Sequence, residues 1–245
     1  MAGPDAGDYL NRMVSNDVEA LAAGGSCEAL LLTPKARIVA PLVVWRRDDD
    51  DFLLLTEPEL AAVVRAQLLR TRFRARCEIE LEEHESTLVL DEVADGIPNR
   101  DYGVPAAEVL DRDVEGEPIA ADELERLRIL ARAPRWGREL DDRVLPAEAG
   151  LDERAISFTK GCYPGQEPVA RLHYRGHPNR TLRVLEVEGD PPYDAELRLG
   201  GKAVGRVTST ADGLALAYVR TEVPDDAVLE FDGGRARLHF AAARP

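Results

Sequence analysis

Lysine, cysteine, methionine and aromatic residues are all scarce in this chain of 245 residues. The three cysteines form no CxxC pair and are odd in number, which argues against a disulfide framework and against a cysteine-based zinc site. No apolar run approaches the roughly 18 to 20 residues that span a bilayer, and the N-terminus lacks a basic-then-apolar signal sequence. We therefore predict a soluble cytoplasmic protein with reduced thiols and no membrane partner.

Positive charge is scarce as well, and lysine most of all. The chain has 46 acidic and 31 basic residues, a formal net charge of -15, and its lysines are Lys35, Lys160 and Lys202. Two explanations stay open: a surface adapted to a high-salt cytoplasm, where self-repulsion is screened, or a biased genome with an ordinary acidic surface. Either one disfavours nonspecific nucleic-acid binding, which depends on excess positive charge. A local basic patch is still compatible with a small bound anion.

The first third of the chain mixes strand and helix patterns. Apolar and β-branched residues predict a hairpin from Lys35–Trp45 and Phe52–Thr56, with the acidic residues 48–51 at its tip. Thr56 followed by Glu59 is a capping-box pattern, which predicts a helix that starts there. Further strands are predicted over residues 77–81 and 87–90. Strands interleaved with a helix indicate an α+β fold.

An acidic middle and a β-rich tail make up the rest. A helix capped by Asp122 is predicted to end before Pro134, and a second helix to cover Pro146–Leu151. Short β-rich runs after Arg180 predict a small barrel of about 65 residues. In its last run Ala236, Leu238 and Phe240 alternate with polar residues. We predict three domains, over residues 1–90, 91–177 and 178–245.

The segment FTKGCYPGQEPVARLHYRGHPNR, Phe158–Arg180, gathers basic residues around one cysteine. Gly161 and Gly165 allow backbone turns whose amide groups can hold a carboxylate or a phosphate. A nearby Lys160 would favour the thiolate form of Cys162. The alternative is an ordinary glycine turn in which the cysteine is a small packed side chain. The segment therefore indicates an anion pocket beside a thiol, with the role of the thiol open.

Two histidines follow the cysteine in the same segment. His173 and His177 have the HxxxH spacing, but they lack a carboxylate partner and a helical context. Zinc sites need three or four convergent ligands in a defined geometry. We therefore predict no metal site.

Several stretches of the sequence resemble one family closely. The chain is similar to the YgfZ branch of the glycine cleavage T-protein superfamily, and the resemblance covers nearly its whole length. The KGCYPGQE motif is highly specific for that branch. The other matching stretches are LNRMVSNDVEAL, LLLTPKARIVAPLVV, RWGRELDDRVLPAEAGL, VARLHYRGHPNR and GKAVGRVTSTADGLALAYVR.

The resemblance implies a fold and a function. The fold would be two interlocked folate-binding α+β units around a central pocket, followed by a small C-terminal β-barrel. YgfZ-type proteins look like tetrahydrofolate-dependent helpers of iron–sulfur enzymes, including one that thiomethylates tRNA, whereas T-protein transfers a methylene unit to tetrahydrofolate. T-protein carries adjacent aspartates where this chain has Ala40 and Pro41. Because neither side chain ionises, we expect no aminomethyl transfer by that chemistry.

This chain departs from the family pattern in two other places. The family's R-I-E-A-G-I-P reads RILARAP here, with Leu130 and Arg132 in place of the acid and the glycine. The family's first strand should precede GPDAGDYL and is not there, so we expect either a start farther upstream or a trimmed sheet. The folate contacts most affected would be those from the first domain and from the helix at Arg128.

The resemblance also assigns site residues. The cofactor would be tetrahydrofolate or a derivative, with Arg171, Arg175 and Arg180 pairing with its glutamate tail and with Gln166 and Glu167 bonding a polar ring edge. Cys162 would be a thiol ligand or redox contact. The predicted folate-binding residues are Lys160, Gly161, Tyr163, Gly165, Gln166, Glu167, Arg171, Arg175, Asn16 and Asp17; the last two are equally compatible with a helix cap.

Three functions follow from these patterns. The preferred one is a monomeric accessory protein that binds folate and an iron–sulfur enzyme client or assembly protein. The first alternative is a folate-dependent one-carbon transferase or demethylase acting on a small substrate. The second is a degenerate family member that binds a partner protein and no folate.

Overall fold

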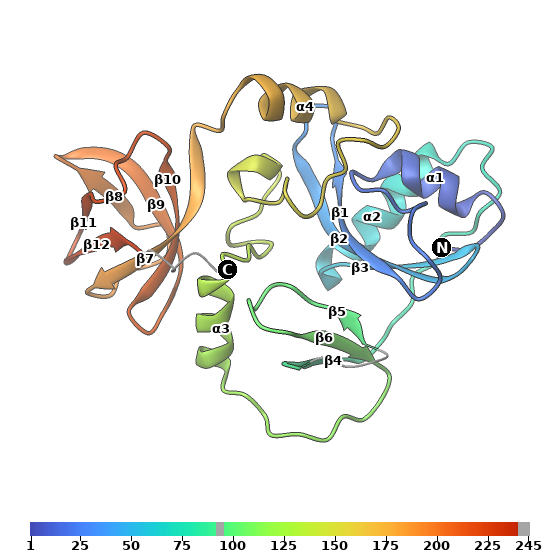
Figure 1. The fold of residues 1–245 in the computed structure, drawn as a ribbon, viewed down its shortest axis with the longest axis horizontal. Helices are drawn as coiled ribbons and strands as arrows, with labels where there is room; N and C mark the ends of the chain where they lie inside the picture. Colours follow the sequence, from blue (N-terminus) through green and yellow to red (C-terminus); the bar gives the residue numbers. More distant parts are fainter. Residues whose placement is uncertain (92–95, 240–245) are drawn as a thin grey trace. The chain divides into compact units, whose positions relative to one another are not determined.

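The computed structural model describes residues 1–91 and 96–239 of the chain. The chain forms two compact units, and each unit is built from two separate segments. Unit 1 comprises Met1–His84 and Asp141–His177, and unit 2 comprises Glu85–Leu140 and Pro178–Pro245. Figure 1 labels the helices and strands, which are mixed as the predicted α+β class requires. The three domain boundaries expected from the sequence stay a prediction.

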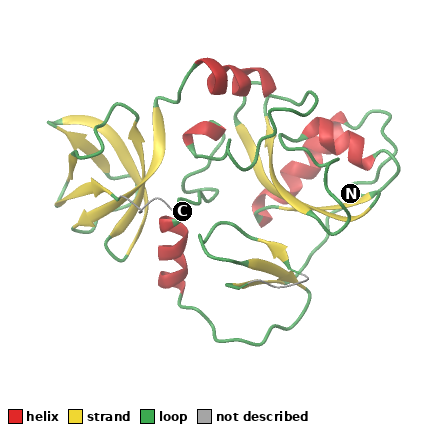
Figure 2. Ribbon diagram, viewed as in Figure 1, coloured by secondary structure: helices red, strands yellow, loops and turns green. Residues whose placement is uncertain are grey.

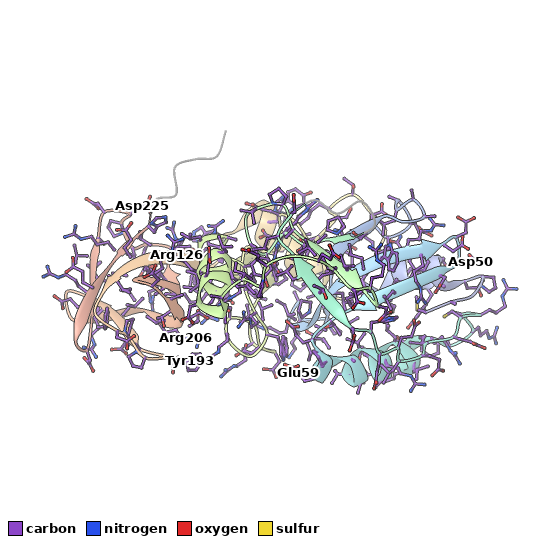
Figure 3. All side chains as sticks on the ribbon, turned by 90° about the horizontal axis from the view of Figure 1, so that it is seen from below. Asp50, Glu59, Arg126, Tyr193, Arg206 and Asp225 are labelled. Atoms are coloured by element: carbon purple, nitrogen blue, oxygen red, sulfur yellow. The ribbon has the colours of Figure 1, made fainter. Side chains whose placement is uncertain are left out.

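A three-stranded antiparallel sheet forms the centre of unit 1, in the order β1-β2-β3. Its strands are β1 (Ser26–Leu32), β2 (Ile38–Asp48) and β3 (Asp51–Leu55). Alternate residues of β2 are buried from Ile38 to Val44, the period of a strand with one face on a core. The predicted hairpin is confirmed, and the side chain of Asp50 at its tip points away from the unit (Figure 3).

Two helices pack with this sheet: α1 (Ala6–Met13) and α2 (Pro58–Thr71). The predicted start of α2 is wrong by one residue, because the N-cap is Glu57. The hydroxyl of Thr56 donates to the carbonyl oxygen of Pro41 on β2 instead, at 2.8 Å. The strand predicted over residues 77–81 is also absent; within that range Glu78 makes an isolated bridge to Ala2.

The second segment of unit 1 holds little regular structure. The helix predicted over Pro146–Leu151 is a single 3-10 turn, η1 (Pro146–Glu148). Loop residues then lead to the helix α4 (Gln166–Arg175), which starts inside the KGCYPGQE motif. The prediction that the histidines lack a helical context is therefore wrong for His173, which lies on α4.

A second small sheet belongs to unit 2, with the order β4-β6-β5. Its strands are β4 (Ser86–Val89), β5 (Ile97–Pro98) and β6 (Ala107–Leu110). The helix α3 (Ala121–Leu130) follows and ends before Pro134, as predicted. Its N-cap is Ala120 and not Asp122, which lies in the first turn, where its charge favours the helix dipole.

Six strands close into the predicted C-terminal barrel, in the order β10-β7-β12-β11-β8-β9 (Figure 2). Closure leaves no open sheet edge, which lets a domain of this size stand alone. The predicted alternation holds for Ala236 and Leu238, which are buried, while Phe240 lies outside the described residues. The strands are β7 (Arg180–Glu188), β8 (Glu196–Leu199), β9 (Lys202–Ala211), β10 (Leu214–Arg220), β11 (Val228–Phe231) and β12 (Gly234–Leu238).

A buried ion pair joins α3 to the barrel. The guanidinium of Arg128 lies 3.1 Å from the carboxylate of Glu139 and donates to the hydroxyl of Ser209 on β9 at 2.8 Å. Ser209 in turn donates to Glu139 at 2.7 Å, and the Tyr218 hydroxyl donates to the Glu139 carbonyl at 3.0 Å. Buried charges are tolerated when they are paired and hydrogen-bonded in this way. Arg128 in the RILARAP stretch thus has a structural role.

No helix within residues 1–91 and 96–239 combines the length and the apolar composition that a membrane crossing requires. Charged side chains stand out from both units instead. Figure 3 labels Glu59 on α2 and Asp225 on the barrel, both of which are exposed. The surface therefore has the polar character that the composition predicts.

Candidate functional site

The glycine before α4 sets the geometry of the KGCYPGQE motif. Gly165 is the N-cap of α4 and has a φ of 85°, a left-handed conformation that favours glycine. A Cβ atom there would lie 2.7 Å from the carbonyl oxygen of Thr33, in the turn between β1 and β2. A Cβ atom added to Gly161 would meet no other atom within 4 Å. One of the two predicted turn glycines is therefore required, because it lets α4 approach the β1–β2 turn.

Lys160 turns its ammonium group inward. The Nζ atom donates to the carbonyl oxygens of Val14 at 2.8 Å and Asn16 at 2.7 Å, and to that of Asn11. Burial lowers the pKa of Lys160 to about 8. An ammonium has three N–H donors, so all of them are used within unit 1. Lys160 holds the loop before α4 against the segment that follows α1.

The cysteines differ in exposure. Cys162 is exposed, Cys27 is half-buried and Cys77 is buried. Burial raises the pKa of Cys27 to about 11, although the charge of Lys160 opposes that change. Cys162 is the thiol that a reagent or partner can reach.

Asn16 and Asp17 serve the local backbone. The amide nitrogen of Asn16 donates to the carbonyl oxygen of Glu28 at 2.7 Å, and its side-chain oxygen accepts the N–H of Asp17 at 2.9 Å. The carboxylate of Asp17 accepts the N–H of Ala20 at 3.2 Å. Asn and Asp side chains commonly form such hydrogen bonds to the nearby backbone in turns and at helix caps.

A hollow of about 470 Å³ lies on unit 1, between the β1–β2 turn, η1 and α4. Arg171 and Arg175 of α4 line it, together with Lys35 and Arg37 of the β1–β2 turn. Its acidic lining residue is Asp152. Four cations against one carboxylate are concentrated here, in a chain whose formal net charge is -15. The hollow is therefore a local exception to the acidity of the chain.

Most of these cations are available to a ligand. Within the described part of the chain, Lys35, Arg171 and Arg175 make no ion pair, and Arg37 donates to the backbone carbonyl of Arg143. Like charges that face one hollow repel each other, and an anion that enters it relieves this repulsion. Guanidinium groups bind carboxylates in a bidentate manner. The geometry thus suits a ligand with several carboxylates or phosphates.

An aromatic stack completes the lining. The rings of Phe158 and His173 lie 3.9 Å apart at 21° to each other, and both residues line the hollow. Tyr174 meets the His173 ring edge-on at 4.8 Å. Stacked rings next to guanidinium groups favour a ligand that combines a flat ring with an anionic part.

Two of the residues that line the hollow, Arg171 and Arg175, were predicted from the sequence. The five other polar or aromatic lining residues were not. The stretch TPKAR could have indicated two of them, because it places Lys35 and Arg37 on either side of Ala36. In the structure this stretch is a turn, in which Ala36 has a φ of 58°. The missed residues are Lys35, Arg37, Asp152, Phe158 and His173.

Other predicted site residues lie elsewhere. Arg180 belongs to unit 2, where its guanidinium sits 4.7 Å from the centre of the Tyr218 ring. Burial raises the pKa of Tyr163 to about 12. No cluster of metal-ligating side chains occurs among the residues that the structure describes. The predicted residues outside the lining of the hollow are Cys162, Lys160, Gly161, Tyr163, Gly165, Gln166, Glu167, Asn16 and Asp17.

Comparisons with known proteins match both the barrel and the whole chain. Residues 179–242 match the family described as the CAF17 C-terminal beta-barrel domain. The tRNA-modifying protein YgfZ of Edwardsiella ictaluri is 27% identical over 292 aligned residues, which cover 97% of this chain and 86% of that protein. The human mitochondrial iron-sulfur cluster assembly factor IBA57 is 36% identical over 103 residues, which cover 39% of this chain and 29% of that protein.

A solved structure shares the fold. The glycine cleavage system aminomethyltransferase T from Bartonella henselae superposes with a TM-score of 0.82 over 98% of this chain and 81% of its own. Its sequence identity is 19%, so this likeness concerns the fold alone. The predicted arrangement of α+β elements followed by a small barrel is confirmed.

Proposed function

We propose, on the premise that this chain is a YgfZ-type protein of the glycine cleavage T-protein superfamily, that it binds a tetrahydrofolate and assists iron–sulfur proteins. The relatives, a tRNA-modifying protein and an iron-sulfur cluster assembly factor, support a role in iron–sulfur cluster assembly or tRNA modification. The folate, its place in the hollow and the function of the thiol are our proposals. The observation that carries them is the basic hollow beside α4.

The anionic end of a folate suits the arginines of the hollow. The glutamate part of the molecule ends in carboxylates, and each further glutamate adds one more. Arg171 and Arg175 stand on the same face of α4, four residues apart, and both are exposed and lack an acidic partner among the described residues. Charge-assisted bonds from guanidinium to carboxylate are the strong class of hydrogen bond. Lys35 and Arg37 on the facing turn bring the number of positive groups to four.

The ring end of a folate needs aromatic surface and an acceptor. Phe158 and His173 supply the aromatic surface, and the carboxylate of Asp152 is an acceptor for the amino group of a pterin. A hollow of about 470 Å³ is within the range of small-molecule sites, roughly 300 to 1,000 Å³. We therefore assign the hollow to one folate molecule.

The site binds folate without using it in aminomethyl transfer. Ala40 is fully buried on β2, and Pro41 pairs with Leu30 of β1. Neither residue supplies the acid that T-protein carries in this segment. A general acid needs an ionisable group within hydrogen-bond reach of the reacting atom. Binding and presentation to a client therefore fit this chain better than catalysis.

Calorimetric titration with a stable reduced folate tests the proposal. We expect Arg175→Ala to weaken binding by about 1 to 3 kcal/mol, because one charge-assisted bond is lost. A poly-glutamylated folate should lose more than the mono-glutamate form if this arginine holds the tail. Arg12→Ala is the matched control, since Arg12 pairs with Asp8 on the surface of unit 1 and does not line the hollow.

Two results would contradict the proposal. Equal affinities of the parent and of Arg175→Ala would remove this arginine from the site. A parent chain that binds no folate, yet restores iron–sulfur enzyme activity in cells lacking the gene, would instead favour the protein-binding module. Restoration that fails in the double variant Arg171→Ala, Arg175→Ala, while its melting temperature is unchanged, would link the hollow to the cellular role.

A further inference from the structure

The end of α2 presents an aromatic ring to solvent in the middle of a run of arginines. The sequence there is RTRFRAR, Arg70–Arg76. Phe73 is 90% exposed, the highest value of any large hydrophobic residue that the structure describes. Large aromatic side chains usually dominate cores and interfaces because they bury so much surface. The nearly complete exposure of the Phe73 ring to water is therefore unusual and needs a physical explanation.

The backbone at this ring is strained as well. The N–H of Ala75 donates to the carbonyl oxygen of Arg72 at 2.9 Å, which closes a tight turn with Phe73 as its second residue. The φ of Phe73 is 45°, a conformation that favours glycine and that a bulky side chain seldom adopts. Strained residues persist where the surrounding structure holds them, and they concentrate at functional sites. The turn thus holds an apolar ring outward at a cost to stability.

Three arginines next to Phe73 in the sequence lack an acidic partner within the described residues. Arg70 donates to the side-chain oxygen of Gln67 at 2.6 Å, and Arg72 donates to the carbonyl oxygen of Cys77 at 2.7 Å. Arg74 is exposed and makes no ion pair there. Arg76 differs, because it is bound to Asp5 through two side-chain bonds, at 3.0 and 2.9 Å. The turn that carries the ring therefore also carries positive charge that no acidic side chain in the described residues neutralises.

We propose that this segment, the Phe73 turn (Arg70–Arg76), binds single-stranded RNA. One unpaired base would stack on the Phe73 ring, and Arg70, Arg72 and Arg74 would contact the adjoining phosphates. Proteins recognise single-stranded nucleic acid with this combination of aromatic stacking and basic groups. The proposal is independent of folate binding, since none of these residues lines the hollow.

A nucleic acid fits the Phe73 turn better than a protein does. A protein interface needs a contiguous apolar core, whereas one base needs one ring. Val63, another exposed large hydrophobic residue, lies on α2 about 12 Å along the helix axis from the last helical residue, Thr71. The net charge of -15 repels long polyanions, so we expect a short, local contact with unpaired nucleotides and no nonspecific binding to duplexes.

Fluorescence anisotropy with a labelled oligouridylate, across a series of KCl concentrations, tests the proposal. Phe73→Gly should weaken binding roughly 5- to 150-fold, the range for losing one stacked base. The same variant should melt at a higher temperature, because glycine relieves the positive φ. Arg74→Gln should lower the slope of log affinity against log salt concentration by about 0.7, the value for one phosphate contact on a single strand.

Tyr193→Ala is the matched aromatic control. Tyr193 is 52% exposed and belongs to unit 2 (Figure 3), whereas the Phe73 turn belongs to unit 1. Arg138 lies 5.1 Å from the centre of the Tyr193 ring, so this substitution removes an exposed aromatic ring next to an arginine. Binding by this control should equal that of the parent.

The proposal is overturned if Phe73→Gly binds the oligouridylate like the parent, if a duplex RNA binds more tightly than the single strand, or if anionic lipid vesicles bind and the oligouridylate does not. A Phe73→Gly variant with a lower melting temperature would overturn the strain argument and assign the ring a structural role.

Discussion

The cations of the KGCYPGQE segment and of α4 fall into two groups, although they are close in sequence. Lys160 is half-buried, and all three of its N–H groups are bonded to backbone carbonyls of unit 1. Arg171 and Arg175 are exposed, line the hollow and have no acidic partner among the described residues. The difference teaches that one basic motif combines a hydrogen-bonded structural clamp with exposed arginines that line a hollow. Positive charge alone does not tell the two apart.

The largest expected effect comes from removing the clamp. Lys160→Met keeps most of the aliphatic stem but leaves three carbonyl groups without their donor, so we expect the free energy of unfolding to fall by about 3 to 5 kcal/mol. Arg175→Ala should change it by less than about 0.5 kcal/mol, since the arginine makes no ion pair within the described residues. Chemical denaturation of both variants measures the difference. Similar losses in the two variants would break the comparison between a structural and a ligand-binding cation.

The two glycines of the motif should differ next most. Gly165→Ala adds a Cβ atom 2.7 Å from the Thr33 carbonyl oxygen at a φ of 85°, so we expect a loss of about 2 to 3 kcal/mol from clash and strain. Gly161→Ala meets open space and should be tolerated. Thermal unfolding of the pair decides the point. If Gly165→Ala were as stable as the parent, the close approach of α4 to the β1–β2 turn would be disproved.

The smallest effect on stability is expected at the exposed thiol. Cys162→Ser should change the free energy of unfolding by less than about 0.5 kcal/mol, because its site is open to water. At pH 8 a thiol reagent should modify Cys162 faster than Cys27, whose pKa burial raises to about 11. Mass spectrometry of a labelling time course measures the order. Equally fast labelling of Cys27, or a strongly destabilised serine variant, would assign Cys162 a packing role.

If Cys162 is the working thiol, the serine variant should also keep its folate affinity and still fail to restore iron–sulfur enzyme activity in cells lacking the gene. Full restoration would show that the thiol is dispensable.

Sequence patterns predicted the elements better than their ends. The β2–β3 hairpin, α3 and the barrel follow from apolar periodicity and turn residues, which are local signals. The caps expected at Thr56 and Asp122 were wrong. The Thr56 hydroxyl found a partner on β2, in Pro41, and no local pattern reports such a choice. The strand predicted over residues 77–81 failed for a related reason: at Glu78 the pairing partner is Ala2, in a single bridge.

By itself the sequence determined the α+β class with its C-terminal barrel, the acidity of the chain, the glycine turns of the motif and the arginines of α4. Each of these features depends on the composition or on residues that are close together in the sequence. Only the tertiary structure decided which cations are free. The carbonyl groups that bind Lys160 lie 144 to 149 residues earlier in the sequence, and the β1–β2 turn that faces Arg171 and Arg175 is similarly remote. Hydrogen-bond partners and pocket walls depend on which distant segments fold together. The same kind of charge is therefore a hydrogen-bonded clamp at Lys160 and an exposed group lining a hollow at Arg171 and Arg175.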